Sequence, residues 1–285
     1  MALGAAPTGP GAGTQVRPLA VGDQAAAMEL CRRDPVASVL AGSHVEALGA
    51  APVRRQLIGL FDGAHLRSLC WAGPNVVPVG AGPDEIGYLA RELIRRGRRC
   101  SSIVGPADAV LGLWEHLRPR WSRARDVRGD QPSLAISGEP QVRSDPLVRR
   151  SRPADFELLF PAAVAMFTEE VGYSPTVAGA GYEARVRELI ERGRSFVRTD
   201  GRHVVFKAEL GAVALGVAQV QGVWVPPELR GRGIATAGVA AVVRTALREV
   251  APTVSLYVNS YNTPALAAYR KVGFRQVGTY ATVLF

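Results

Sequence analysis

The sequence has few residues of the kinds that bind metals or form disulfides. Its 285 residues include 3 cysteines and 4 histidines. No two cysteines form a CxxC pair and no histidine lies at ligand spacing from them, which disfavours structural zinc and a disulfide framework. No stretch approaches the roughly 18 apolar residues of a membrane span, and the N-terminus lacks the basic segment of a secretion signal. We therefore expect a cytoplasmic protein with no metal and no membrane partner.

Lysine is almost absent as well. Lys207 and Lys271 are the lysines, and arginine supplies the remainder of the 34 basic residues. Set against 25 acidic residues they give a formal net charge of +9, which is spread over both halves of the chain. Such a spread is typical of a solvated surface, so a nucleic-acid partner is not expected. A hydrophobic content of 47% can fill a core and excludes global disorder.

Two halves of the chain show the same pattern. The length allows one large domain or two of about 140 residues. Arg17 is followed by Asp23 and an apolar-periodic segment, and Arg149 is followed by Asp155 and a similar segment at the same spacing. Each pattern predicts a short strand, a turn and a helix that begins at the aspartate. The chain therefore reads as two related units.

The order of the later elements agrees between the halves. Asp-Gly turns between apolar runs, at residues 62–63 and 200–201, predict a hairpin in each half. The first hairpin is followed by predicted elements at 75–79 (strand), 84–98 (helix), 101–104 (strand) and 107–117 (helix). The second is followed by elements at 213–225 (strand), 234–249 (helix), 253–258 (strand), 263–271 (helix) and 276–284 (strand).

The domain boundary is placed in a segment rich in glycine, proline and serine. We expect a flexible tail over residues 1–14, a first domain over 15–135, a linker over 136–145 and a second domain over 146–285. An apolar patch at 134–136 is read as a short closing strand. The fold class is α/β (α+β mixed sheet), with helices packed on the faces of each sheet.

A glycine-rich turn follows the strand that ends at Val225. Arg-Gly-Arg-Gly occupies residues 230–233, and a helix of small residues opens at Ile234. Glycines let backbone N–H groups approach an anion, and the helix N-terminus adds its unpaired donors. No GxxxxGK[ST] loop is present, and the third glycine and acidic residue of a Rossmann fingerprint are missing. The pattern indicates a pyrophosphate site, with a glycine-rich turn carrying exposed arginines as the alternative.

A second motif lies downstream of that turn. A strand delivers Asn259, and Asn262 is placed to cap the next helix. Tyr269 lies two turns later on the same helical face, and Gly273 ends the helix. The alternatives are that Asn262 is only a helix cap and that Tyr269 is only a packing aromatic.

Together the two motifs resemble the GCN5-related N-acetyltransferase (GNAT) family. Residues 230–235 match its Q/R-x-x-G-x-G/A acyl-CoA motif, and residues 259–274 match its N…N-x-x-A-x-x-x-Y-x-x-x-G-F segment. The resemblance covers residues 146–285, and the whole chain resembles actinobacterial tandem GNAT proteins with a divergent N-terminal unit. It implies two tandem GNAT-like acyl-CoA N-acyltransferase folds. It also implies that the strands ending near Val225 and Asn259 splay, with the pantetheine of acetyl-CoA between them.

The resemblance implies an N-acetyltransferase that moves an acetyl group from acetyl-CoA, its cosubstrate, to a primary amine by direct attack in a ternary complex. Tyr269 matches the position that protonates the leaving thiolate, and the Val225 N–H is the candidate oxyanion donor. The implied contacts of acetyl-CoA are Val223, Trp224, Val225, Arg230, Gly231, Arg232, Gly233, Ile234, Ala235, Asn259 and Asn262.

The general base is not evident from the motifs. Many members of the family place a glutamate on the strand before the pyrophosphate turn, but residues 218–223 contain no carboxylate. Glu209 and Glu170 are the candidate substitutes, acting through water, with solvated charges as the alternative. Glu169 and Tyr173 are the candidate contacts of the acceptor, which is a small molecule or a protein amino group. Acidic residues there suit a cationic amine.

The first half lacks the charges of the second. Residues 75–85 keep two glycines but no arginine, and Asp84 and Glu85 place negative charge at the start of the helix, which opposes anion binding. We therefore expect a degenerate GNAT-like domain that shapes or covers a single active site in the second half. A non-catalytic acyl-CoA sensor and a nucleic-acid or scaffold protein are the alternative functions. A homodimer paired through the last strand is left open.

Overall fold

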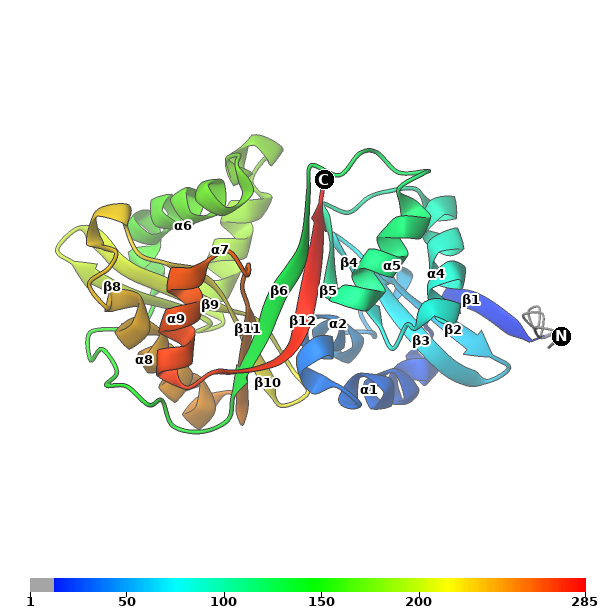
Figure 1. Cartoon of the computed structure of the whole chain (residues 1–285), viewed down its shortest axis with the longest axis horizontal. Coiled ribbons are helices and arrows are strands. Elements are labelled where there is room, and N and C mark those ends of the chain that lie inside the picture. Colours follow the sequence, from blue (N-terminus) through cyan, green and yellow to red (C-terminus); the bar gives the residue numbers. More distant parts are fainter. Residues whose placement is uncertain (1–12) are drawn as a thin grey trace, which may run out of the picture. The chain divides into compact units, whose positions relative to one another are not determined.

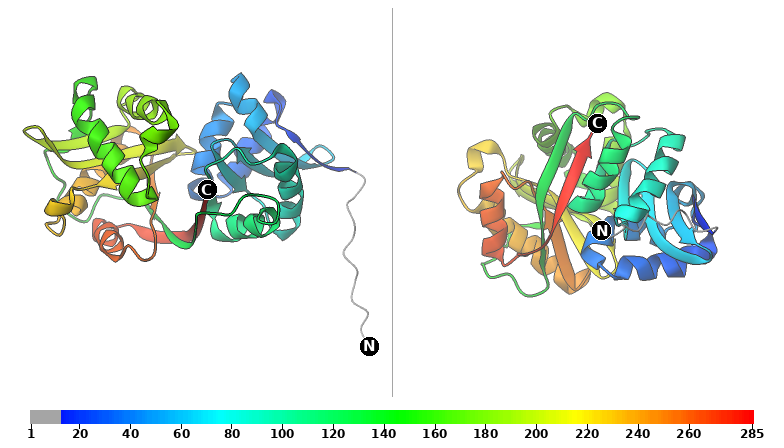
Figure 2. Two further views of the ribbon diagram at one scale, coloured as in Figure 1. Left: turned by 90° about the horizontal axis from the view of Figure 1, so that it is seen from above. Right: turned by 45° about the vertical axis from the view of Figure 1, so that its right-hand side comes forward.

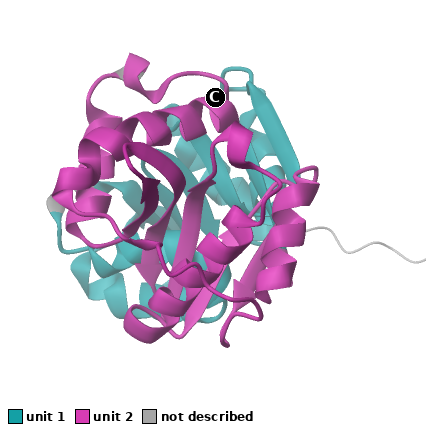
Figure 3. Ribbon diagram, turned by 90° about the vertical axis from the view of Figure 1, so that its left-hand side faces the viewer, with its two compact units in different colours: residues 1–131, 279–285 teal, residues 132–278 magenta. Residues whose placement is uncertain are grey.

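The chain forms two compact units in a computed structural model that describes residues 13–285, without the side chains of residues 51, 52 and 178. Unit 1 comprises Met1–Gln131 and Thr279–Phe285, and unit 2 comprises Pro132–Gly278 (Figure 3, teal and magenta). Most of the expected tail lies outside the described residues, and its last residue, Thr14, begins the first strand.

Figure 1 labels most of the strands and helices of unit 1. Its elements are β1 (Thr14–Pro18), a 3₁₀ turn (Val21–Asp23), α1 (Gln24–Arg32), α2 (Pro35–Glu46), α3 (Ala51–Gln56), β2 (Leu57–Asp62), β3 (His65–Ala72), β4 (Asn75–Val79), α4 (Pro83–Arg96), β5 (Ser102–Pro106), α5 (Ala107–Leu117) and the first part of β6 (Asp126–Ile136).

Unit 2 has a similar order, with two α-helices before its hairpin where unit 1 has three. Its elements are the end of β6, β7 (Arg149–Arg150), a 3₁₀ turn (Pro153–Asp155), α6 (Phe156–Val171), a 3₁₀ turn (Pro175–Ala178), α7 (Gly181–Glu191), β8 (Ser195–Asp200), β9 (His203–Ala214), β10 (Val217–Trp224), a 3₁₀ turn (Pro227–Leu229), α8 (Ile234–Glu249), β11 (Thr253–Tyr257), α9 (Thr263–Val272) and the start of β12 (Arg275–Leu284).

Each unit is built on a mixed sheet, as predicted. The strand order is β1-β2-β3-β4-β5-β12 in unit 1 and β6-β11-β10-β9-β8-β7 in unit 2. The pairs β4–β5 and β10–β11 are parallel, whereas the hairpin pairs β2–β3 and β8–β9 are antiparallel. Helices cover both faces: α4 and α5 pack on the face opposite α1 and α2, and α8 and α9 on the face opposite α6 and α7 (Figures 1 and 2).

The duplicated Arg and Asp pattern forms the same structure in both units. Arg17 donates two hydrogen bonds to the Asp23 carboxylate, at 2.6 and 3.0 Å, and Arg149 does the same to Asp155, at 2.6 and 2.8 Å. Each carboxylate also accepts from the backbone N–H three residues earlier. The aspartate therefore closes the 3₁₀ turn before the helix, where the sequence predicted a helix cap.

The predicted strand over residues 213–225 is wrong. Leu215 and Gly216 have φ values of 57° and 73° and form a tight turn between β9 and β10. Positive φ at both central residues is the geometry of a two-residue hairpin loop. The chain thus reverses where a continuous strand was expected, and β9 and β10 become neighbours in the sheet.

Two strands lie across the boundary that the sequence indicated. Residues 133–136 at the end of β6 pair with β11 of unit 2, whereas residues 280–284 of β12 pair with β5 of unit 1. Each unit therefore contains a strand segment from the sequence range expected for the other. The Thr282 hydroxyl donates to Gln131 at 2.6 Å within unit 1, which helps to hold the C-terminal segment there.

Candidate active site

Two parallel strands of unit 2 separate before they end. The pairing of β10 with β11 covers residues 217–219 and 253–255, and each strand then continues beyond its last paired residue. The pairing of β10 with β9 shifts register between Gln221 and Trp224, which marks a β-bulge. Gly222 in the bulge has a φ of 60°, and a Cβ there would lie 3.0 Å from the Glu209 carboxyl carbon and 3.1 Å from the Lys207 Nζ. The bulge thus brings the backbone of β10 close to two charged side chains.

The arginine-glycine turn joins β10 to α8. Gly231 and Gly233 have φ values of 76° and 77°, and Gly233 is the N-cap residue of α8, whose first turn has no side-chain cap. Arg230 donates from Nε to the Val225 carbonyl at 3.0 Å, and Arg232 donates to the Glu228 carbonyl at 3.2 Å. The helix N-terminus and two guanidinium groups therefore place positive potential at this turn.

The second motif folds as its sequence indicated. The Asn262 side chain accepts from the Ala265 N–H at 3.2 Å and caps α9, which ends at Gly273 with a φ of 112°. Tyr269 is buried on α9 and packs edge to face against Phe274. Burial, and secondarily the charge of Glu170, raises the pKa of Tyr269 to about 12. Its hydroxyl therefore keeps its proton across the neutral range.

The neighbouring glutamates of α6 make different contacts. Asn259 donates to Glu170 at 3.3 Å. Arg230 binds Glu169 through both terminal nitrogens at 2.7 Å, and the Trp224 indole N–H donates to the same carboxylate at 3.3 Å. The hydrogen bonds from Arg230 hold the pKa of Glu169 below its usual range. Glu169, expected at the acceptor, therefore contacts two of the residues expected at acetyl-CoA.

Glu209 lies in a buried polar group on β9. The Lys207 ammonium is 3.2 Å from one carboxylate oxygen of Glu209, and the Gln221 amide donates to the other at 3.1 Å. Lys207 is 1% exposed and Glu209 8%. A buried lysine needs a counter-charge, which Glu209 supplies. Glu209 thus faces Gln221, on the strand where the family often has its glutamate.

These polar groups share one face of the sheet. Phe206, Ala208 and Leu210, which alternate with them along β9, belong to the apolar cluster under α8 and α9. On the opposite face, Tyr182 of α7 donates to the Ala163 carbonyl at 3.0 Å. The pKa of Tyr182 is raised mainly by burial and secondarily by the charge of Glu209. Lys207, Glu209 and Gln221 therefore lie on the α6 and α7 side of unit 2.

Lys207 and Gln221 were not among the residues singled out from the sequence. The signal was nonetheless present, because Lys207 and Glu209 alternate with apolar residues in the run 203–214, which puts both charges on one face of a strand. Tyr173, expected at the acceptor, is 38% exposed and packs edge to face against Phe167.

The corresponding turn of unit 1 is built differently. Gly82 begins α4, and its N–H donates at 3.1 Å to Glu85, which also pairs with Arg67 at 3.3 Å. A carboxylate of the same helix thus occupies the first turn.

Burial raises the pKa of Cys31 and Cys70 to about 12, so these thiols stay protonated.

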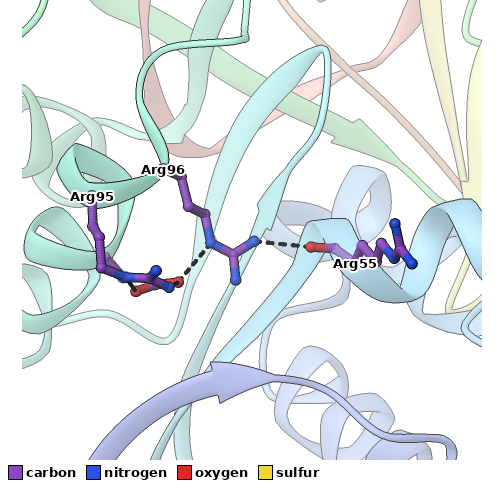
Figure 4. A network of polar contacts seen from close by, with 4 residues as sticks. Arg55, Arg95 and Arg96 are labelled. Carbon is purple, nitrogen blue, oxygen red and sulfur yellow. Dashed lines mark hydrogen bonds and ion pairs between the residues drawn. The ribbon is translucent and has the colours of Figure 1, made fainter.

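Several arginines of unit 1 support the fold. Arg96 donates to Glu92 at 2.6 Å and to the Arg55 carbonyl at 2.9 Å, and Arg95 also binds Glu92 (Figure 4). These contacts join the end of α4 to α3, so part of the net charge has a structural use.

Among residues 13–285, no helix has the length and hydrophobicity needed to cross a membrane, and no group of three or more metal-ligating side chains is found.

Comparisons with known proteins agree with this geometry. Residues 174–274 match the model of the acetyltransferase (GNAT) family, and residues 55–159 match that of a domain of unknown function (DUF4081). No curated protein sequence matches the chain.

Several solved structures have a fold similar to that of this chain. A GCN5-related N-acetyltransferase from Sphaerobacter thermophilus has 17% identity and a TM-score of 0.63, covering 95% of each chain. A GNAT-family acetyltransferase from Colwellia psychrerythraea has 12% identity and a TM-score of 0.55, covering 95% of this chain and 99% of the other. A tandem GNAT protein from the clavulanic acid biosynthesis pathway has 13% identity and a TM-score of 0.52, covering 95% and 98%. The chain therefore carries an acetyltransferase (GNAT) family domain at residues 174–274, within a tandem pair of GNAT-like folds.

Proposed function

We propose that the protein is an N-acetyltransferase that transfers an acetyl group from acetyl-CoA to a primary amine, with one active site in unit 2. The GNAT fold supports acyl transfer in general. The observation that carries the finer proposal is the placement of the arginine-glycine turn and the buried Tyr269 after two parallel strands that separate. The turn suits a pyrophosphate, and the tyrosine suits a leaving thiolate.

Acetyl-CoA fits the donors that the separated strands leave available. The backbone of residues 223–225, at the end of β10 and just after it, lies beyond the pairing with β11, which suits the amides of the pantetheine arm. Amides of residues 230–235 would bind the pyrophosphate, and the Val225 N–H would stabilise the oxyanion that develops on the thioester. Asn262 would serve as a helix cap and cofactor contact together.

Direct transfer needs an acid and a base. The amine nitrogen attacks the thioester carbonyl carbon, a C–N bond forms and the C–S bond breaks. Tyr269 gives its proton to the CoA thiolate, and the proton lost by the amine passes to a carboxylate through water. A primary amine with a pKa near about 10.4 is mostly protonated at neutral pH, so removal of its proton assists the attack.

Glu209 is the base that the contacts favour. It lies against the bulge of β10, and its two hydrogen bonds leave acceptor sites on the carboxylate. Glu170 contacts Asn259 and influences Tyr269, so it suits a role in keeping that hydroxyl protonated. The acceptor is a cationic amine, because the carboxylates of Glu169 and Glu170 lie on α6 beside these groups.

The test measures free thiol released from acetyl-CoA in the presence of a diverse panel of amines. We expect turnover with at least one primary amine, and a loss of about 100-fold in kcat for Glu209→Gln against a smaller loss for Glu170→Gln. Equal losses of kcat in Glu209→Gln and Glu170→Gln would mean that Glu209 is not favoured over Glu170 as the base. Release of no thiol with any amine, combined with tight binding of acetyl-CoA, would instead support a non-catalytic acyl-CoA sensor, for which the engagement of Glu209 by Lys207 is the favouring observation.

A further inference from the structure

Glu169 holds the pyrophosphate turn through a contact that resembles the binding of a phosphate. Its two oxygens each accept a 2.7 Å hydrogen bond from Arg230. The planar guanidinium matches carboxylate and phosphate oxygens with the same two-pronged geometry. The Glu169 carboxylate therefore occupies the N–H donors of Arg230 that an oxyanion of CoA would use.

The contact is open to exchange. The side chains of Arg230 and Glu169 are 44% and 50% exposed, so water and a ligand can reach both. Ion pairs at this exposure contribute little to stability, because solvent screens them. A pyrophosphate carries more charge than one carboxylate and also gains the backbone amides at the start of α8, where no side chain caps the first turn.

The contact also connects the two sides of the candidate site. Arg230 donates a hydrogen bond to the Val225 carbonyl just after β10, and Trp224 of β10 donates to Glu169. Glu169 precedes Glu170, which contacts Asn259. Release of Glu169 from Arg230 would thus leave a carboxylate without a charged partner beside the groups proposed for the acceptor amine.

We propose that Glu169 is an exchangeable internal ligand of Arg230: the pyrophosphate of CoA displaces it, and the freed carboxylate then binds the ammonium group of the acceptor. This inference rests on the proposed function. Because coupling between two sites is reciprocal, acetyl-CoA and a cationic acceptor would each raise the affinity for the other.

The test uses isothermal titration of the full chain with CoA. Because Glu169→Gln removes the competing charge at nearly constant size, we expect it to lower the Kd for CoA by about twofold to fivefold, the range of a screened ion pair. Pantetheine, which lacks the pyrophosphate and is measured as a competitor of CoA, should bind both forms equally. Glu157→Gln, an exposed carboxylate on the same helix, is the matched control and should leave the Kd unchanged.

A second variant separates exchange from a supporting role. In an Arg230→Gln background, Glu169→Gln should no longer improve CoA binding, since the contact is already lost. An unchanged or higher Kd for CoA in the single variant Glu169→Gln would overturn the exchange and make Glu169 a fixed support of Arg230. An equal gain for pantetheine, or for Glu157→Gln, would also overturn it. Absence of CoA binding by the natural chain would instead overturn the proposed function itself.

Discussion

The turn after β10 in unit 2 and the turn after β4 in unit 1 share a backbone plan and differ in charge. Both strands pair in parallel with a neighbour over only a few residues, at 217–219 in β10 and 75–76 in β4. Both then reach a helix through a glycine-containing turn. In unit 2 the turn carries Arg230 and Arg232, whereas in unit 1 Glu85 accepts the N–H of Gly82 at the helix start.

This difference concerns how the start of each helix satisfies its backbone N–H groups. A helix N-terminus has unpaired N–H groups that must find acceptors. In unit 1 a carboxylate of the same helix satisfies one of them, and in unit 2 the first turn carries no side-chain cap. We therefore expect variants of the two turns to have similar effects on folding and different effects on CoA.

The largest expected effect is that of Tyr269→Phe. Loss of the proton donor should reduce kcat by about 100-fold or more, as removal of a general acid commonly does. The Kd for acetyl-CoA should change little, because the ring and its packing remain. Thiol release under saturating acetyl-CoA measures the effect, and Tyr88→Phe in unit 1 is the matched control. If Tyr269→Phe turns over at the rate of the natural chain, Tyr269 is a packing residue.

The same tyrosine predicts a pH dependence. With its pKa raised to about 12 by burial and by Glu170, Tyr269 is in its protonated, proton-donating form at all pH values below that. The rate should therefore show no alkaline decline from this group between about pH 7 and 10. A decline in that range that disappears in Tyr269→Phe would contradict the assignment.

The next effect compares two glycines with positive φ, one in the turn of each unit. Gly233 and Gly80 have φ values of 77° and 63°, where a Cβ costs about 1–2 kcal/mol. Gly233→Ala and Gly80→Ala should therefore both lower the free energy of unfolding, measured in urea. Gly233→Ala should in addition weaken acetyl-CoA binding by about tenfold, corresponding to about 1.4 kcal/mol. Weakening of the same size in Gly80→Ala would place a CoA contact in unit 1.

A smaller effect is expected for Glu85→Ala. Loss of its hydrogen bond to the Gly82 N–H should destabilise unit 1 by about 1 kcal/mol, the usual contribution of a helix cap. No second acetyl-CoA should bind, because the turn carries no arginine in place of Arg230 and Arg232. Denaturant unfolding and equilibrium dialysis measure the two quantities. A gain of a second site would show that the carboxylate alone blocks unit 1.

The smallest effects should be those of Asp23→Asn and Asp155→Asn. Their arginine partners lower the pKa of both carboxyl groups. The stabilisation is thus present above the ordinary pKa of about 4 and is lost as the pH falls through the lowered folded value. Each variant should lose up to about 1 kcal/mol at pH 7, since the arginines are partly exposed, and should lose less further stability below about pH 4. Unequal losses would show that the repeated contact differs between the units.

Local patterns predicted the parts of the site that depend on short stretches of chain. The helix over residues 234–249 has the expected bounds, and Asn262 and Gly273 begin and end α9 as expected. These features depend on backbone conformation and capping, which neighbouring residues determine. The contacts of Glu169 with Arg230 join segments far apart in sequence, so no local pattern indicated them.

The features that the sequence analysis did not predict can also be explained physically. The buried face of helix α2 includes Ser38 and Gly42, whereas the apolar Val36 and Leu40 are only partly buried, so the sequence shows no clear apolar stripe. The turn at Leu215 lies inside an apolar run, which hid the reversal of the chain. The exchange of strand segments in β6 and β12 depends on pairing between distant segments. The alternation of apolar and polar residues along one strand does not identify the strand with which it pairs.

The number of acetyl-CoA molecules bound per chain tests the central claim most directly. Isothermal titration of the full chain should give one equivalent, and Gly233→Ala should weaken that binding while Gly80→Ala leaves it unchanged. Two equivalents per chain, or one equivalent that responds to Gly80→Ala alone, would contradict the assignment of a single acetyl-CoA site to unit 2.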